Sequence, residues 1–308
     1  EKKFIAMLVC VALMGCIFVS AQDICKTVAN VPMVQLNNGV LMPQFGLGTF
    51  MQSSGSIEQS CLTALKMVID ISILLMHNDE AGVGRAVKES GISREKIWIT
   101  SKLWPTEYGE SKTLEAIEDI GTHAIGFVHQ PAGDFVGAWR DMGKVRALGI
   151  SNFDANDEAF EKIMIESRVK PAVLQIECHS YAQRLAIRDK VKPYGIHITC
   201  WFLLGGAMSN GALFSLHPIN SQGTCKSPVQ IILRWHIQGD FSVIPGASNL
   251  DYIKENIAIF DFELNNKKME QMCSLNKEKR FFNATQEEVE KMVWNTEIRT
   301  EWIEDIGR

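Results

Sequence analysis

Short apolar runs alternate with segments of helical periodicity along most of this chain. Continuous Val/Ile/Leu runs of this length, separated by helical stretches, are typical of parallel strands that are buried on both faces. The pattern therefore predicts an α/β fold, a (β/α)8 TIM barrel whose functional residues lie at the carboxyl ends of the strands. Eight segments are candidate strands: 45–50, 68–72, 97–102, 125–129, 145–152, 172–177, 197–201 and 242–245.

Before the first strand, residues 33–43 predict a β-hairpin with Asn38-Gly39 as a two-residue turn, which we expect to plug one end of the barrel. Almost no loop separates Pro131 from Trp139, and the helix expected between Trp139 and Gly143 is very short, so we expect truncated loops. No segment resembles an interdomain linker, which predicts one barrel domain over 22–308 with a helical tail from about 285 that packs on the barrel exterior. Helices are expected at 57–67, 81–89, 111–119, 157–166, 183–192, 228–238, 251–257 and 287–306.

Residues 1–21 differ from the rest of the chain. A charged start, Glu1-Lys2-Lys3, precedes a long apolar stretch, and Val19-Ser20-Ala21 offers small residues for cleavage. This arrangement predicts a secretory signal peptide and a secreted protein with no membrane contact after cleavage. The alternative is an N-terminal membrane anchor.

Composition narrows the function classes further. The formal net charge of the 308 residues is -5, and no basic stripe indicates a nucleic-acid partner. Six of the eight cysteines follow the predicted signal, and their spacing resembles neither a disulfide scaffold nor a metal-binding motif. We expect Cys178 and Cys200, which lie in apolar runs, to be buried free thiols.

Six short motifs occur in a fixed order between residues 34 and 280: MP…GLGTF, ITSKLWP, LGISNF, PAVLQIECH, LRW and KEN. Taken together, they resemble the aldo-keto reductase family. The resemblance implies a (β/α)8 barrel that binds NADPH in extended form without a Rossmann glycine motif. It also implies hydride transfer to a small-molecule carbonyl substrate.

In that family a tyrosine donates the proton, a lysine lowers its pKa, an aspartate pairs with the lysine and a histidine orients the carbonyl. The motifs assign these last three roles to Lys102, Asp70 and His129. The tyrosine position falls on Leu75, or on Met76 in the other possible alignment, and neither residue can donate a proton. A general acid contributes about 10²–10⁴ in rate, so impaired activity is expected, with water or His77 as the remaining proton source.

The resemblance also implies a cofactor site. Family residues that bind the nicotinamide amide match Ser151, Asn152 and Gln175, and Trp201 replaces the tyrosine that stacks on the ring. Residues 244–249 lack the usual lysine after the proline, and Tyr252 stands where arginine is common, so NADPH is expected with NADH as the alternative. Further cofactor contacts are implied for Gly48, Thr49, Leu204, Gly205, Glu255 and Asn256.

Three functional hypotheses follow. The first is a secreted, monomeric NAD(P)H-dependent reductase of an aldehyde or ketone, with a steroid ketone among the candidate substrates. The second is a catalytically silent barrel that binds a dinucleotide or a small hydrophobic ligand. The third is the product of a damaged gene that does not fold.

Overall fold

A computed structural model describes residues 31–49, 52, 54–67, 72–74, 80–109, 113, 124–132, 134–141, 145–205 and 226–295. The predicted signal peptide, Asp70, His77 and nearly all of the 111–119 helix lie outside these residues. Within them, no helix has both the length and the apolar character needed to cross a membrane.

Eight parallel strands in the described part of the chain form one sheet in sequential order, from β3 to β10. Parallel bridges from Phe45 to Val243 and from Gly48 to Gly246 join the first strand to the last. The sheet therefore closes on itself, which confirms the predicted TIM barrel. The strands are β3 (Gly46–Gly48), β4 (Ser72–Leu74), β5 (Trp98–Leu103), β6 (Ala124–Val128), β7 (Ala147–Ser151), β8 (Val173–Glu177), β9 (His197–Trp201) and β10 (Ser242–Val243).

Closure of the barrel requires a glycine at Gly48. Its main-chain N–H donates to Pro245 O at 3.1 Å. A Cβ atom at this position would lie 2.8 Å from Ile244 O, closer than side chains tolerate. The missing side chain thus lets β3 and the segment after β10 approach closely.

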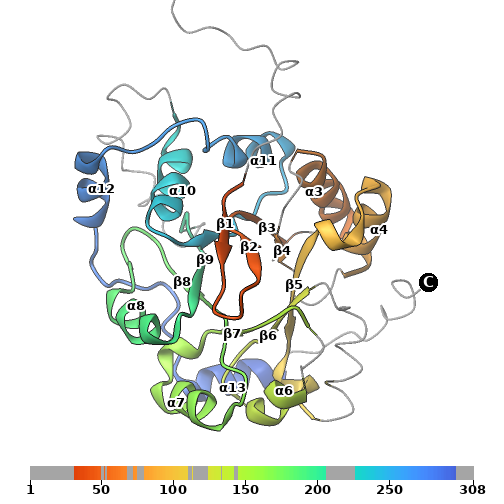
Figure 1. The fold of residues 1–308 in the computed structure, drawn as a ribbon, viewed down its shortest axis with the longest axis vertical. Coiled ribbons are helices and arrows are strands. Elements are labelled where there is room, and N and C mark those ends of the chain that lie inside the picture. Colours follow the sequence, from red (N-terminus) through yellow and green to blue (C-terminus); the bar gives the residue numbers. More distant parts are fainter. Residues whose placement is uncertain are drawn as a thin grey trace, which may run out of the picture.

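Helices surround the barrel (Figure 1). The α10 helix begins with a capping box, in which Ser227 Oγ accepts from Gln230 N and the Gln230 side chain accepts from Ser227 N. The helices are α3 (Ser54–Met67), α4 (Glu80–Ser90), α6 (Phe135–Asp141), α7 (Asp157–Glu166), α8 (Leu185–Val191), α10 (Pro228–Gln238), α11 (Leu250–Ile257), α12 (Asn266–Cys273) and α13 (Gln286–Asn295). Short 3-10 turns are η1 (Arg94–Lys96), η2 (Pro105–Glu107), η3 (Phe153–Ala155) and η4 (Lys192–Tyr194).

An antiparallel hairpin of β1 (Met33–Gln35) and β2 (Leu41–Pro43) lies across the near end of the barrel in Figure 1. The hairpin confirms the prediction, but its turn differs. Leu36 N donates to Val40 O, and Gly39 N donates to Leu36 O, so three residues form the loop. Only Gly39 in this loop has positive φ, at 84°, whereas the predicted two-residue turn needs two such residues.

Apolar side chains fill the amino-terminal end of the barrel. Leu36 and Met42 of the hairpin pack there against Trp98, Ile125 and other inward-facing strand residues. A cavity enclosed at this end has a volume of only about 10 Å³. The barrel interior is therefore filled at this end, the sealed end, and the functional site of a TIM barrel is expected at the carboxyl end, which we call the mouth.

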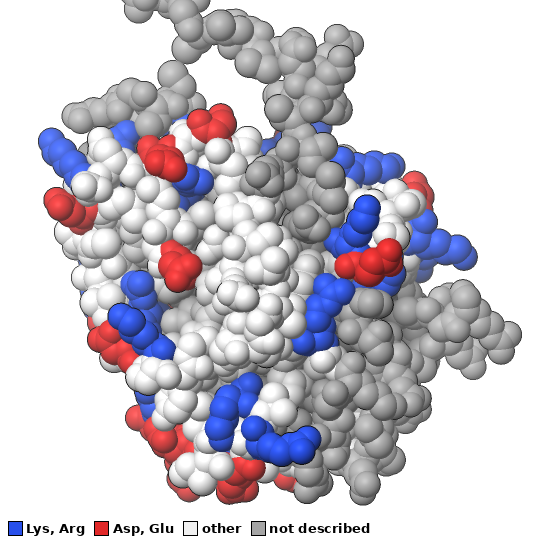
Figure 2. Space-filling view, viewed as in Figure 1, with Lys and Arg blue, Asp and Glu red and all other residues white. Residues whose placement is uncertain are grey.

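The hairpin face carries charges of both signs around its periphery. Figure 2 shows Lys and Arg interspersed with Asp and Glu there, with uncharged surface near the centre of the view. The described surface on this face thus presents no continuous basic patch of the kind that nucleic-acid binding needs.

Three elements differ from prediction. The strand expected at 68–72 lies at Ser72–Leu74. The short helix begins at Phe135 instead of near Trp139, because the Asp134 side chain accepts a hydrogen bond from Gly137 N and caps it. The tail helix α13, in contrast, begins at Gln286, close to its predicted start, and contacts η2, which follows β5 at the mouth. The α12 helix was not predicted, because Met272 is its only buried residue and leaves no apolar periodicity.

Candidate functional site

Lys102 and His129 occupy the inner face of the mouth on neighbouring strands. Thr100 and Phe127 line the small space inside the barrel, and side chains two residues further along a strand share the same face. Lys102 pairs in register with Phe127, and His129 N donates to Leu103 O at 3.2 Å. The ammonium and the imidazole therefore come from adjacent strands and point to the same side, as predicted.

Burial controls the charge of Lys102. The side chain is buried, and in the described part of the chain no carboxylate forms an ion pair with it. Because burial disfavours the charged form, the pKa of Lys102 falls from 10.5 to about 7. An amine with this pKa is present in both protonation states near neutral pH, which is the property required of a proton donor.

The His129 imidazole is held from two sides. Its Nδ1 atom lies 3.3 Å from Ser151 Oγ on β7. The indole of Trp104 packs against the ring, with centroids 4.9 Å apart. These contacts fix the ring plane at the mouth, so the imidazole orientation is set by two neighbouring strands.

Three predicted nicotinamide-binding residues lie next to His129. Ser151 on β7 pairs in register with Gln175 on β8, and Asn152 N donates to Gln175 O at 3.0 Å. Asn152 adopts the left-handed conformation, with φ of 66°, and its Oδ1 accepts from Trp201 Nε1 at 3.1 Å. The structure thus brings together the mouth set: Lys102, His129, Ser151, Asn152, Gln175 and Trp201.

A carboxylate that the sequence analysis did not assign also lies at this end. Glu177, the last residue of β8, is fully buried and accepts from Phe281 N at 2.6 Å and Phe282 N at 3.2 Å. Although burial would raise the pKa of Glu177, the hydrogen bonds from His179 and these two N–H groups hold it below its usual value. Glu177 therefore fixes the chain segment that precedes α13.

Aromatic rings form the adjacent wall of the mouth. Phe202 has φ of 60°, which is unusual for a bulky residue, and its ring packs 4.8 Å from Phe282 and 5.5 Å from Phe281. Trp201 also meets Phe282 edge to face, with centroids 4.8 Å apart. Glu177 and this aromatic cluster together place the 281–282 segment beside Trp201. The signal missed in the sequence was the pair of adjacent phenylalanines before the tail.

The remaining predicted cofactor residues are spread along the barrel edge. Thr49 is buried directly after Gly48. Gly205 ends a tight turn in which its N–H donates to Phe202 O at 3.0 Å, and Leu204 is half-buried in that turn. Asn256 is buried on α11 beside β3, whereas the neighbouring Glu255 is half-buried.

Two parts of the predicted acid–base site lie outside the described residues: Asp70 and the positions aligned with the proton donor. Of the four tyrosines in the chain, Tyr108 has its hydroxyl hydrogen-bonded to Gln130 O at 3.1 Å, one residue after His129. The Tyr108 hydroxyl is thus hydrogen-bonded to the main chain directly after His129.

Comparisons with known proteins agree with this geometry. The sequence profile of the Aldo/keto reductase family matches residues 130–277. The chain is 33% identical over 267 residues to a 9,11-endoperoxide prostaglandin H2 reductase of Trypanosoma cruzi (strain CL Brener), covering 80% of this chain and 92% of the relative. It is 34% identical over 264 residues to a glyoxal reductase of Bacillus subtilis (strain 168), covering 80% and 94%.

The fold is similar to that of solved structures as well. A mutant of Gox0644 in complex with NADPH superimposes with a TM-score of 0.72 and 27% sequence identity, covering 80% of this chain and 94% of that chain. The similarity therefore extends over most of the barrel and includes a dinucleotide-bound relative.

Proposed function

The chain belongs to the aldo/keto reductase family, and we propose from this premise that it reduces a small aldehyde or ketone with NADPH at the mouth of the barrel. One relative is named a glyoxal reductase, and glyoxal is a carbonyl compound. The structure of the Gox0644 relative was solved with NADPH. Both relationships support carbonyl reduction as the reaction class.

One observation on this chain supports a nicotinamide site in particular. Gln175 Oε1 is buried and has no hydrogen-bond partner among the described residues. A buried acceptor without a donor is costly, so it fits a ligand that brings an N–H group. The carboxamide of nicotinamide carries such a group, and Ser151 and Asn152 lie beside Gln175 to bind it. The residues present therefore fit the nicotinamide group of the cofactor.

NADPH supplies a hydride to the carbonyl carbon when it is bound. The residues of the chain orient the carbonyl oxygen and protonate it. His129, fixed by Ser151 and Trp104, is placed to donate a hydrogen bond to that oxygen. Lys102 shares this face of the mouth, and its pKa of about 7 makes its ammonium a better acid than an exposed lysine.

Lys102 thus takes the place of the family's tyrosine as proton donor in this proposal. A buried ammonium is a less specific donor than a positioned phenol, so we expect turnover slower than a typical kcat of about 10 s⁻¹. The missing tyrosine also supports the alternative of a barrel that binds dinucleotide without turnover.

A two-step experiment tests the proposal. NADPH is titrated while its fluorescence is followed, and NADPH consumption is then measured with glyoxal and with a ketosteroid. We expect wild-type binding, slow glyoxal reduction, weaker binding in Gln175→Met and loss of turnover with retained binding in Lys102→Met. Tyr108→Phe is the matched control and retains turnover. Binding without any turnover would select the silent barrel, and loss of turnover in Tyr108→Phe would assign proton donation to that tyrosine.

A further inference from the structure

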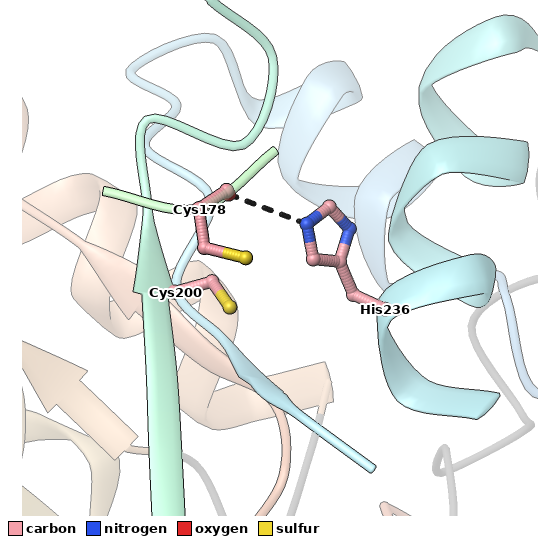
Figure 3. A group of neighbouring side chains, drawn as sticks. All are labelled: Cys178, Cys200 and His236. Carbon is pink, nitrogen blue, oxygen red and sulfur yellow. Dashed lines mark hydrogen bonds between the residues drawn. The ribbon is translucent and has the colours of Figure 1, made fainter. Parts of the chain in front are cut away.

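Three potential metal ligands from different elements meet behind the barrel wall. The sulfurs of Cys178 and Cys200 and a ring nitrogen of His236 all lie within 4.8 Å of one another. Cys178 directly follows β8, Cys200 is on β9, and His236 is in the last turn of α10. Figure 3 shows both sulfur atoms next to each other on the side of the strands that faces the His236 imidazole.

We propose that Cys178, Cys200 and His236 bind a zinc ion, which connects β8 and β9 to α10. Two thiolates and an imidazole are a ligand combination that zinc prefers in proteins. The proposal is independent of the cofactor site, because these side chains lie on the outer side of the strands, with Cys178 and Cys200 in the core cluster between sheet and helices.

The orientation of the imidazole supports the proposal. His236 Nδ1 lies 2.8 Å from Ile232 O, the main-chain oxygen one helical turn earlier, and can donate its N–H there. In the neutral ring Nε2 then carries a lone pair, although it faces another acceptor, Cys178 O, at 3.3 Å. A ring held by one nitrogen on a main-chain oxygen is the usual arrangement of a zinc-binding histidine, and coordination of the ion by Nε2 would replace the contact of this nitrogen with Cys178 O.

Burial and charge select zinc among the ions that bind thiolates. All three residues have no solvent exposure. A net charge in such an environment is strongly unfavourable. Zn²⁺ with two thiolates and a neutral imidazole gives a neutral site, whereas Cu⁺ leaves one negative charge. The Cys178 main-chain oxygen lies on the same side and can complete a fourth position.

Zinc binds thiolates, so coordination releases the proton of each cysteine, and the affinity for the ion rises with pH.

The test is a titration of the full-length, reduced, metal-free protein with Co²⁺, which reports thiolate coordination by sulfur-to-metal charge-transfer and ligand-field absorption. We expect one equivalent to bind, Zn²⁺ to displace it, and Zn²⁺ to raise the thermal unfolding midpoint by roughly 5–10 °C. The absorption should vanish in Cys200→Ala and His236→Gln. It should persist in Cys61→Ala, a buried cysteine outside the cluster, and in Cys273→Ser, an exposed one.

Circular dichroism of each variant shows whether it has folded. We expect Cys200→Ala to keep its fold, so that its loss of absorption reports the loss of a metal ligand. Absence of absorption in the wild-type protein would overturn the proposal. So would absorption that persists in Cys200→Ala, or a Cys178–Cys200 disulfide in the isolated protein with no Co²⁺ bound after reduction. None of these results depends on NADPH binding, so failure here is distinguishable from failure of the reductase proposal.

Discussion

His129 Nδ1 lies 3.3 Å from Ser151 Oγ, and this contact joins the ends of β6 and β7 at the mouth. A second histidine–serine pair, His197 Nε2 and Ser242 Oγ at 2.9 Å, joins β9 and β10 near the sealed end. Both pairs are buried inside the barrel. The same chemical contact therefore occurs once at the proposed site and once away from it.

This repetition gives a matched pair of variants. Ser151→Ala removes a hydrogen bond that orients His129, and a bond of this kind contributes about 0.5–1.5 kcal/mol, so we expect a roughly three- to tenfold loss in kcat/KM for glyoxal. Ser242→Ala should cost similar stability but leave kcat/KM unchanged. Steady-state kinetics and urea unfolding measure both quantities. Equal kinetic effects of the two variants would contradict the assigned role of Ser151.

The pKa of Lys102 predicts a specific pH dependence of stability. The group titrates at about 7 in the folded protein and at 10.5 when unfolded, so between these values the unfolded state binds more protons. Stability should rise as pH increases from 7 toward 10.5, and the destabilising effect is complete below 7. At 1.36 kcal/mol per pKa unit, the full effect is about 5 kcal/mol.

Lys102→Met removes this titration and should stabilise the protein at pH 6–7 relative to the wild type. Urea unfolding midpoints measured across the pH range check the result. Midpoints that change in parallel for both proteins would show that Lys102 titrates normally. Reduction of glyoxal by the wild-type protein should fall above pH 7, because the ammonium that donates the proton is lost.

Glu177 should be the most sensitive carboxylate at the mouth. Glu177→Gln leaves Arg280 and two main-chain N–H groups with a weaker acceptor, which we expect to cost about 3 kcal/mol. Because the pKa of Glu177 is lowered by folding, its contribution is present at neutral pH and lost as pH falls below the usual carboxyl range.

The control for Glu177 is Glu263→Gln. Glu263 pairs with Arg234 but its side chain is 80% exposed, so its loss should cost under about 1 kcal/mol. Limited proteolysis should cleave the 280–295 segment faster in Glu177→Gln only. Equal protection in both variants would show that Glu177 does not hold this segment.

The close packing of Gly149 against Phe127 predicts that the barrel interior does not tolerate a larger residue at position 149. A Cβ on Gly149 would lie 2.4 Å from the Phe127 ring, so Gly149→Ala should destabilise the fold by about 1–3 kcal/mol. Gly55 in α3 has no atom within 4 Å of such a Cβ, and Gly55→Ala should be neutral or stabilise by up to about 1 kcal/mol. Thermal unfolding of the two variants checks this difference in sign.

The sequence predicted the barrel because each strand and helix carries its own local periodicity. Lys102, His129 and Ser151 could be placed near one another because they lie at the ends of apolar runs whose carboxyl ends meet in a barrel, whereas the role of Gln175 came from the family resemblance. The Cys178 and Cys200 thiols are buried and free, as predicted.

Features that depend on distant contacts were not predictable in this way. The α12 helix has one buried residue, and its end is fixed by Gln183, whose side chain donates to Met272 O and Cys273 O. The hold of Glu177 on the tail and the approach of His236 to the two cysteines both join residues far apart in sequence. Neither leaves a spacing signal in the chain.

Transfer of deuterium from labelled NADPH tests the reductase assignment most directly. The full-length protein is mixed in excess with NADPH carrying deuterium at the transferable position and with glyoxal, and the alcohol product is analysed by mass spectrometry. We predict one deuterium per product molecule with the wild-type protein, and at least a tenfold lower yield with His129→Gln. Wild-type protein that binds NADPH but forms no deuterated alcohol would contradict the account.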